Sequence, residues 1–172
     1  MFSIETARCI INEWRDLPEE RAAFRRWTTD VEMMRHVTGT AWSDADREKF
    51  FARQRASMEK AGVCFGPARL KESGEVIGVV GAQPLELVDD WHLGWWIDPR
   101  WQGQGLATEL ARAALDHVLD VAKRPRAVAV IAPENHASRR VAEKIGMRHV
   151  ATVPGNTLES RWKAEDVVLY GS

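Results

Sequence analysis

The chain of 172 residues is short of cysteine and of net charge, and each shortage excludes a class of protein. Its two cysteines, Cys9 and Cys64, lie in apolar segments without the spacing of a metal or redox motif. We therefore expect reduced core thiols rather than a disulfide framework. A formal net charge of −1 leaves no broad positive surface for nucleic acid. These shortages predict a small or local partner and no nucleic acid.

Long hydrophobic runs are also missing. No apolar stretch has the length of a transmembrane helix, and the first residues lack the basic segment and long apolar run of a secretion signal. We therefore expect a cytoplasmic protein with no membrane partner. Hydrophobic residues make up 45% of the chain and charged residues 28%, which is typical of a folded domain with a substantial core. The length suits one domain over residues 1–172.

The order of the predicted helices and strands indicates the fold class. Apolar periodicity, turn residues and capping residues predict helices at 18–27, 30–36, 43–60, 106–123 and 135–146. The same patterns predict strands at 6–14, 62–71, 76–82, 93–97, 127–132, 147–153 and 166–170, with a loop at 154–163. We expect an α/β (α+β) fold whose mixed, mostly antiparallel central sheet is flanked by helices.

A glycine-rich loop lies between a predicted strand and a predicted helix. The strand at 93–97 ends before Pro99, because proline cannot donate to a β-ladder. Gly103 and Gly105 then allow sharp turns and close approach of a ligand to the backbone. The helix that begins at Leu106 offers unpaired N–H groups and a favourable dipole, which suit an anion. A tight connection that needs glycine only for its turn is the competing interpretation.

The loop resembles a known binding motif. Gln102, Gly105 and Ala107 spell Q-x-x-G-x-A within GWWIDPRWQGQGLATE. This block resembles the acetyl-CoA pyrophosphate loop of the GNAT superfamily of N-acetyltransferases.

A later segment strengthens the resemblance. ENHASRRVAEKIGMRHV is similar to the N-x-x-S-x-x-x-x-x-K-x-G segment of the RimJ/RimL-like branch, with Asn135, Ser138, Lys144 and Gly146 in place. The two segments stand in the order and at the separation typical of the family.

The resemblance implies an acetyl-CoA-dependent N-acetyltransferase that transfers the acetyl group directly, without a covalent acyl-enzyme. In the family the pantetheine arm lies between two central strands that splay apart, here 93–97 and 127–132. Main-chain groups near Trp96 and Ile97 are therefore expected pantetheine contacts. The expected pyrophosphate contacts are Gln102, Gly103, Gln104, Gly105, Leu106, Ala107 and Thr108, and Asn135 and Ser138 are expected on the second helix of the acetyl-CoA site.

The general base departs from the common pattern. Many GNAT enzymes carry a glutamate two residues before the position of Gly94, and this chain has His92 there. A histidine, whose ordinary pKa is near ~6.5, can take a proton at neutral pH directly or through a water. A structural histidine at the sheet surface is the competing interpretation. Asp89, Asp90 and Glu32 are alternative bases.

The group that assists the leaving thiolate also departs from the pattern. Many family members place a tyrosine seven residues after the asparagine, where this chain has Ala142, and its only tyrosine is Tyr170. Ser138 remains, and the branch resemblance places such a serine near the sulfur. Asn135 and Ser138 are equally the residues that a helix N-terminus favours for capping.

Rival functions and open questions remain. Histidines share no spacing with carboxylates or cysteines, so we predict no metal. A dinucleotide site would need a third glycine, which is missing. A non-catalytic acyl-CoA-binding module or sensor is the alternative function.

Residues 30–54 resemble the acceptor side of the GNAT cleft, but the acceptor stays open between a protein N-terminus and a small amine such as an amino acid, polyamine or antibiotic. A homodimer through an exposed sheet edge is a further possibility.

Overall fold

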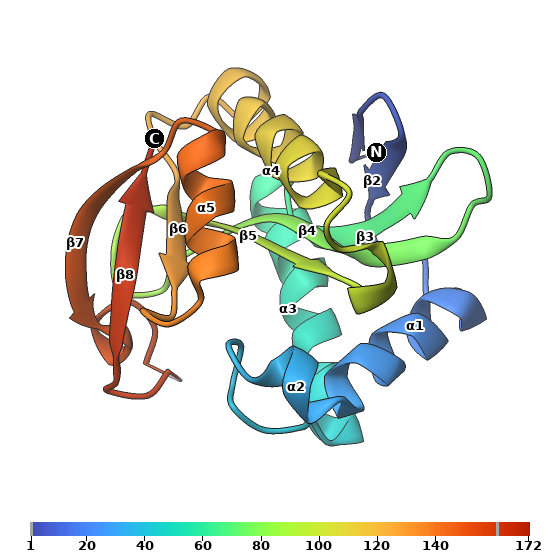
Figure 1. The fold of residues 1–172 in the computed structure, drawn as a ribbon, viewed down its shortest axis with the longest axis horizontal. Helices are drawn as coiled ribbons and strands as arrows, with labels where there is room; N and C mark the ends of the chain where they lie inside the picture. Colours follow the sequence, from blue (N-terminus) through green and yellow to red (C-terminus); the bar gives the residue numbers. More distant parts are fainter. Residues whose placement is uncertain (1, 161) are drawn as a thin grey trace.

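A computed structural model of the chain describes residues 2–160 and 162–172, which fold around one eight-stranded sheet (Figure 1). The strands follow the order β1-β2-β3-β4-β5-β6-β8-β7, and every neighbouring pair is antiparallel except β5 with β6. The strands are β1 (Ser3–Glu5), β2 (Cys9–Asn12), β3 (Phe65–Leu70), β4 (Val76–Pro84), β5 (Trp91–Ile97), β6 (Val128–Ile131), β7 (Arg148–Pro154) and β8 (Asp166–Gly171). The predicted class, a mixed and mostly antiparallel sheet flanked by helices, is confirmed.

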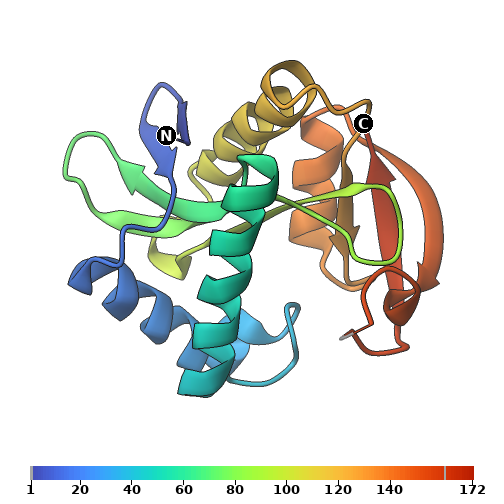
Figure 2. The same ribbon diagram turned by 180° about the vertical axis from the view of Figure 1, so that it is seen from behind.

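Helices cover both faces of this sheet. α4 (Leu106–Asp116) and α5 (His136–Lys144) lie on one face, and α3 (Asp44–Ala61) lies on the other, as the two opposite views show (Figure 1, Figure 2). α1 (Pro18–Thr29) and the short α2 (Val31–Met34) lie near the beginning of α3. The two faces of the central strands are therefore lined by different helices, and each can present different side chains.

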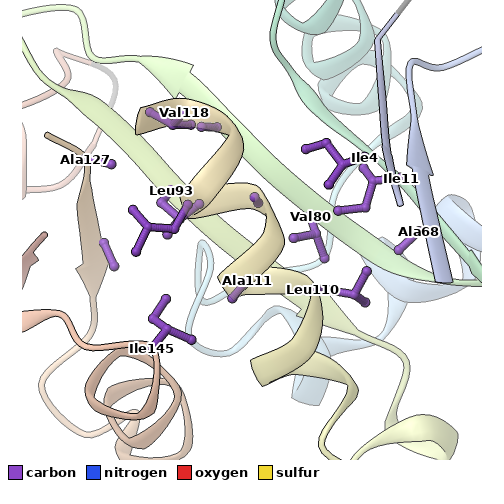
Figure 3. Close-up of a cluster of buried hydrophobic side chains, with 14 of the residues drawn as sticks. Ile4, Ile11, Ala68, Val80, Leu93, Leu110, Ala111, Val118, Ala127 and Ile145 are labelled. Carbon is purple, nitrogen blue, oxygen red and sulfur yellow. The ribbon is translucent and has the colours of Figure 1, made fainter. Parts of the chain in front are cut away.

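The apolar side of α4 forms the middle of the main core. Leu110 and Ala111 are fully buried and belong to the same cluster as Val80 of β4 and Leu93 of β5 (Figure 3). Full burial of one leucine side chain is worth about 1.5–3 kcal/mol. This packing holds the helix, and with it the loop that precedes it, against the central strands.

Local capping residues set the beginnings of α2 and α3 and the end of α5 close to where the sequence predicts them. The predicted helix 106–123 is shorter: α4 ends at Asp116 and is followed by a π-helical turn at His117–Val121. Asp30 and Ser43 accept hydrogen bonds from the first turns of α2 and α3. At the end of α5, Gly146 has a φ of 88°, and Met147 N donates to Ala142 O at 3.0 Å. The two caps satisfy N–H groups at the beginnings of α2 and α3, and the Met147 bond satisfies a carbonyl at the end of α5.

The N-terminal strand was predicted incorrectly. Residues 6–14 were expected to form one strand, but β1 and β2 form a hairpin that turns at Thr6–Arg8. The Thr6 hydroxyl accepts from Cys9 N at 2.9 Å and donates to Cys9 O at 3.2 Å, so a short side chain closes the turn. Local hydrogen bonding by threonine thus overrides its preference for an extended strand.

Candidate functional site

The central strands β5 and β6 separate soon after they meet. They run parallel, but they pair only at His92 with Val128 and Leu93 with Ala129. On its other edge β5 remains paired with β4 as far as Ile97. The second half of β5 therefore has one edge without a β-ladder partner, at the place where the sequence predicts a splay.

Backbone direction decides which residues face this open edge. Residues of an antiparallel pair alternate between bonding the partner strand and pointing away from it. Asp98 N donates to Ile77 O at 2.8 Å, so the main chain of Asp98, and that of Trp96 two residues earlier, points to β4. The main chains of Trp95 and Ile97 point to the side where β6 diverges. From the sequence, the main chain of Trp96 is expected to contact pantetheine at the open edge, but the alternation directs it toward β4.

The glycine loop after β5 is built on two left-handed residues. Gly103 has a φ of 75° and Gly105 a φ of 77°, and Gly105 is the N-cap residue of α4. A Cβ added to Gly103 would have no neighbour within 4 Å, which leaves the space above the loop open. Gln102 Nε2 donates to Ile97 O at 2.9 Å and so anchors the loop to β5.

The start of α4 has free hydrogen-bonding capacity. No side chain in the described part of the protein caps this helix. Leu106 is buried, whereas Ala107 and Thr108 are partly exposed and the loop before them is exposed. An N-terminus of this kind presents backbone N–H groups and a positive dipole to the adjacent space. It is chemically suited to an anion such as a phosphate or diphosphate.

A buried carboxylate secures the point where β5 ends. Asp98 is 2% exposed and accepts hydrogen bonds from Trp27 Nε1 at 2.7 Å, Arg26 Nη2 at 2.9 Å and Arg100 N at 3.0 Å. Burial alone would raise the pKa of Asp98, but these donors outweigh it and hold the pKa well below its ordinary value. Asp98 therefore joins α1 to the beginning of the glycine loop.

His92 lies on the face of the sheet opposite α4 and α5. Its ring makes edge contacts with Phe65 and with Trp162, each with ring centroids 5.4 Å apart. Leu93, the next residue, belongs instead to the core under α4. The structure thus places the imidazole on the α3 side of the splayed strands. There it lies against an aromatic wall that consists of Phe65 and Trp162.

The alternative bases are engaged elsewhere or exposed. Arg126 donates to both carboxylate oxygens of Asp90, at 2.6 Å each, so Asp90 is part of a bidentate ion pair. Asp89 is exposed, and the Glu32 side chain is 81% exposed and 3.4 Å from Arg35. None of the three shares the aromatic wall of His92.

Ser138 and Asn135 meet at the beginning of α5, on the α4 face. Asn135 Oδ1 accepts from Ser138 N at 3.1 Å, so the capping interpretation of Asn135 is correct. The Ser138 hydroxyl takes no part in that bond. Ser138 and His92 thus lie on opposite faces of the sheet, on either side of the divergence between β5 and β6.

Tyr170 does not take the place of the missing tyrosine. Its hydroxyl accepts from Arg139 Nε at 3.2 Å and donates to Glu143 Oε1 at 3.1 Å, so it ties β8 to α5. Tyr170 is only 2% exposed, and Ala142, at the usual tyrosine position, is fully buried. The phenol is part of the core beneath α5.

Sequence reasoning missed two contacts between distant segments of the chain. His36 Nδ1 lies 3.4 Å from Glu134 Oε1, which joins the segment after α2 to the turn before α5. A backbone N–H bond, assisted by His36, lowers the pKa of Glu134. The connection between β7 and β8 supplies Trp162 beside His92, and Arg161 in it lies outside the described residues. No local pattern could reveal these contacts, because each joins distant segments.

Nucleophilic and metal chemistry have little support. Both cysteines are free and buried, and burial raises the pKa of the Cys64 thiol to about 12. Over residues 2–160 and 162–172 there is no group of three or more side chains suited to hold a metal ion. Within those same ranges, none of the helices combines the length and apolar character needed to cross a membrane.

Two hollows lie away from His92, Ser138 and the glycine loop, and the second of them is lined in part by Asp89. One, of about 230 Å³, is bordered by Trp14, Arg21 and Phe51, and the other, of about 460 Å³, by Lys60, Leu87 and Arg124 among others. Neither borders His92, Ser138 or the glycine loop. The candidate site is therefore defined by the strand divergence and the loop, and neither of these two hollows is part of it.

Comparison with known proteins gives a consistent result. The model of the acetyltransferase (GNAT) domain matches residues 8–148. The chain is 27% identical over 146 residues to the uncharacterized N-acetyltransferase YnaD of Bacillus subtilis (strain 168), covering 84% of this chain and 82% of that protein.

Solved structures share the fold. An acetyltransferase from Agrobacterium tumefaciens str. C58 superposes with a TM-score of 0.83 at 25% identity, over 100% of this chain and 94% of that one. RimL, described as a ribosomal L7/L12 alpha-N-protein acetyltransferase in complex with coenzyme A, superposes with a TM-score of 0.79 over 99% of this chain and 97% of that one. Its identity is 15%, so the likeness to RimL concerns the fold alone.

Proposed function

Since this chain belongs to the GNAT acetyltransferase family, we propose that it uses acetyl-CoA as donor and transfers the acetyl group directly to a primary amine. The observation that carries the proposal is one junction. A pair of diverging parallel strands leads into a loop with two left-handed glycines at the uncapped start of α4. This junction offers an open strand edge for an extended pantetheine chain, next to a binding site for an anion.

The loop fits the diphosphate of acetyl-CoA. The open space above Gly103 and the N–H groups at the start of α4 suit a doubly charged ligand that approaches the backbone closely. The residues proposed to hold it are Gln102, Gly103, Gln104, Gly105, Leu106, Ala107 and Thr108. RimL, which has the same fold, is described in complex with coenzyme A, and this supports the choice of ligand.

The open edge of β5 fits the pantetheine arm. Its amides need backbone donors and acceptors, and Trp95 and Ile97 present theirs on this edge. Ile97 O already accepts from Gln102 Nε2, so the main chain of Trp95 is the better candidate. We propose Trp95 in place of Trp96 for this contact, with Ile97 as its neighbour.

The chemistry requires little of the protein beyond orientation and proton handling. The acetyl group arrives as a thioester, the C–S bond breaks, an N–C bond forms, and the amine gives up a proton. His92 takes that proton, directly or through a water. The rings of Phe65 and Trp162 hold its imidazole in place.

On the other side of the sheet, the Ser138 hydroxyl donates a hydrogen bond to the departing thiolate. Asn135 orients this first turn of α5 through its bond to Ser138 N. The buried cysteines are poor nucleophiles, which favours direct transfer over a covalent acyl-enzyme.

The acceptor is an amine, either a protein N-terminus or a small molecule. The names of YnaD and RimL support an amino group as acceptor, and RimL acts on the α-amino group of a protein. Acceptor choice depends on two segments: the connection between β7 and β8, which brings Trp162 to His92, and the region after α2, which contacts Glu134 through His36. Both are irregular segments, in which substrate preference commonly resides.

Calorimetric titration with acetyl-CoA, and separately with NAD, tests the donor. We expect micromolar affinity for acetyl-CoA and no binding of NAD. Release of free CoA is then measured with N-terminal peptides, amino acids, polyamines and aminated antibiotics. Binding without amine-dependent release of CoA would favour a non-catalytic acyl-CoA-binding module, and no binding of acetyl-CoA would contradict the proposal.

A further inference from the structure

Arg8 reaches the glycine loop from the opposite end of the sequence. It lies in the turn between β1 and β2, which Thr6 closes through its bonds to Cys9. The backbone of Arg8 is held on both sides, because its N–H donates to Glu109 Oε1 at 2.9 Å and its carbonyl accepts from Lys71 N at 2.9 Å. These two bonds fix the backbone from which the Arg8 side chain extends.

The guanidinium joins two parts of the proposed diphosphate-binding site, the glycine loop and α4. Its Nε donates to Glu109 Oε2 at 2.7 Å, and its Nη2 lies 2.7 Å from the same oxygen. Its Nη1 donates to the carbonyl oxygen of Gln104 at 3.0 Å. Glu109 stands in the first turns of α4, so one side chain links the helix to the loop that precedes it. Burial opposes ionisation of Glu109, but bonds from Thr6 and Arg8 prevail and lower its pKa.

The bond to Gln104 fixes the direction of the next N–H group. A trans peptide is planar, so its carbonyl oxygen and the following N–H point in opposite directions. Gln104 O is held toward Arg8, so the N–H of Gly105 points to the side of the loop that faces away from Arg8. A Cβ built on Gly105 would lie 3.8 Å from Arg8 Nη2, so the guanidinium lies directly beside this residue.

We propose that Arg8 is a positioning residue for the diphosphate of the acyl donor: it orients the Gln104–Gly105 peptide so that the Gly105 N–H and the first N–H groups of α4 converge on one anion. The inference rests on the proposed use of acetyl-CoA. Arg8 contributes through the loop and not by direct contact, because it holds Gln104 O and so lies on the side of the Gln104–Gly105 peptide opposite the Gly105 N–H. An ammonium cannot form the same fork, so lysine should replace it poorly.

The test is to compare Arg8→Ala and Arg8→Lys with Arg126→Ala. Arg126 is a matched control, because it also pairs with a carboxylate through Nε and Nη2, here with the two oxygens of Asp90, outside the glycine loop. We expect Arg8→Ala to weaken CoA binding by roughly tenfold or more and Arg8→Lys to be intermediate, as for the loss of a charge-assisted hydrogen bond. Arg126→Ala should bind CoA like the unmodified protein. Thermal unfolding of all three variants monitors folding, and Arg8→Lys keeps the test decisive if Arg8→Ala does not fold.

Steady-state kinetics separates positioning from general damage. In the Arg8 variants the KM for acetyl-CoA should rise, while kcat at saturating acetyl-CoA and the KM for the amine stay unchanged. A parallel titration with 3′-dephospho-CoA locates the effect: the same loss with both ligands supports the diphosphate, and a loss seen only with CoA would overturn the inference in favour of the 3′-phosphate. Arg8 variants that bind as tightly as Arg126→Ala would also overturn it. If the unmodified protein fails to bind CoA at all, it is the proposed function that fails.

Discussion

Trp27 Nε1 lies 2.7 Å from Asp98 Oδ2 and donates a hydrogen bond to it across 71 residues of sequence. Trp27 belongs to α1, and Asp98 directly follows β5, so this bond joins α1 to the strand that leads into the glycine loop. Trp27 and Asp98 are each 2% exposed. A buried, charge-assisted bond therefore connects α1 to the end of β5.

Asp98→Asn should lower stability and alter its dependence on pH. Loss of the charge weakens bonds to Arg26 and Arg100 as well as to Trp27, and we expect a decrease of about 2–3 kcal/mol in the free energy of unfolding near neutral pH. The folded-state pKa of Asp98 lies below that of an unfolded aspartate, near ~3.9, so its contribution is complete above about pH 4. It disappears as the pH falls toward the folded-state value.

Urea denaturation over a pH series checks this expectation. The difference between the unmodified protein and Asp98→Asn should shrink as the pH is lowered below about 4. Glu32→Gln, which changes a side chain that is 81% exposed, serves as a control and should cost less than about 0.5 kcal/mol. A constant difference at every pH would show that the charge of Asp98 is unimportant.

Gly103→Ala should weaken acetyl-CoA binding without a clash inside the protein. The added Cβ meets no protein atom within 4 Å, so the affinity is lost through the ligand or through a shift of the left-handed backbone. We expect a loss of roughly tenfold, the size of one strong contact. Gly74→Ala is the matched control, since Gly74 has a φ of 72° and equally open surroundings in the turn between β3 and β4. Calorimetry should show normal affinity in the control, and equal affinities in the two variants would remove the loop from the proposed site.

His92→Ala should reduce turnover by roughly 10²–10⁴-fold, the usual contribution of a general base. In the unmodified protein the rate should rise with pH as the imidazole loses its proton, and this acidic limb should disappear in the variant. Acetyl-CoA affinity should not change. His149→Ala, which changes an exposed histidine on β7, should retain both the rate and the limb. A pH–rate profile that keeps its acidic limb in His92→Ala would contradict the assignment.

Ser138→Ala and Asn135→Ala should have different effects. Asn135 Oδ1 caps α5 by accepting from Ser138 N, a bond that the serine-to-alanine change leaves in place. We therefore expect Asn135→Ala to lower the free energy of unfolding by about 1 kcal/mol. Ser138→Ala should lower kcat with little change in stability. Denaturation and initial rates measured on both variants decide the matter, and an unchanged kcat in Ser138→Ala would leave the serine with no role in catalysis.

Local chemistry determined much of this protein. Proline before the loop, glycines at left-handed positions and side chains such as Asp30, Ser43 and Asn135 act over a few residues, so the sequence predicts the helix ends and the loop directly. The divergence of β5 and β6 follows instead from the family resemblance, and the structure shows it as a ladder of two residue pairs.

Only the tertiary structure decided which distant residues complete the site. The bond of Arg8 to Gln104, the burial of Asp98 under Trp27 and the contact of Trp162 with His92 each join segments that no local pattern relates. The tertiary structure also decided that the main chain of Trp95, rather than that of Trp96, faces the open edge of β5. This direction depends on the register of β5 with β4. Register and long-range side-chain contacts arise from the packing of the whole chain, and they distinguish a motif from a site.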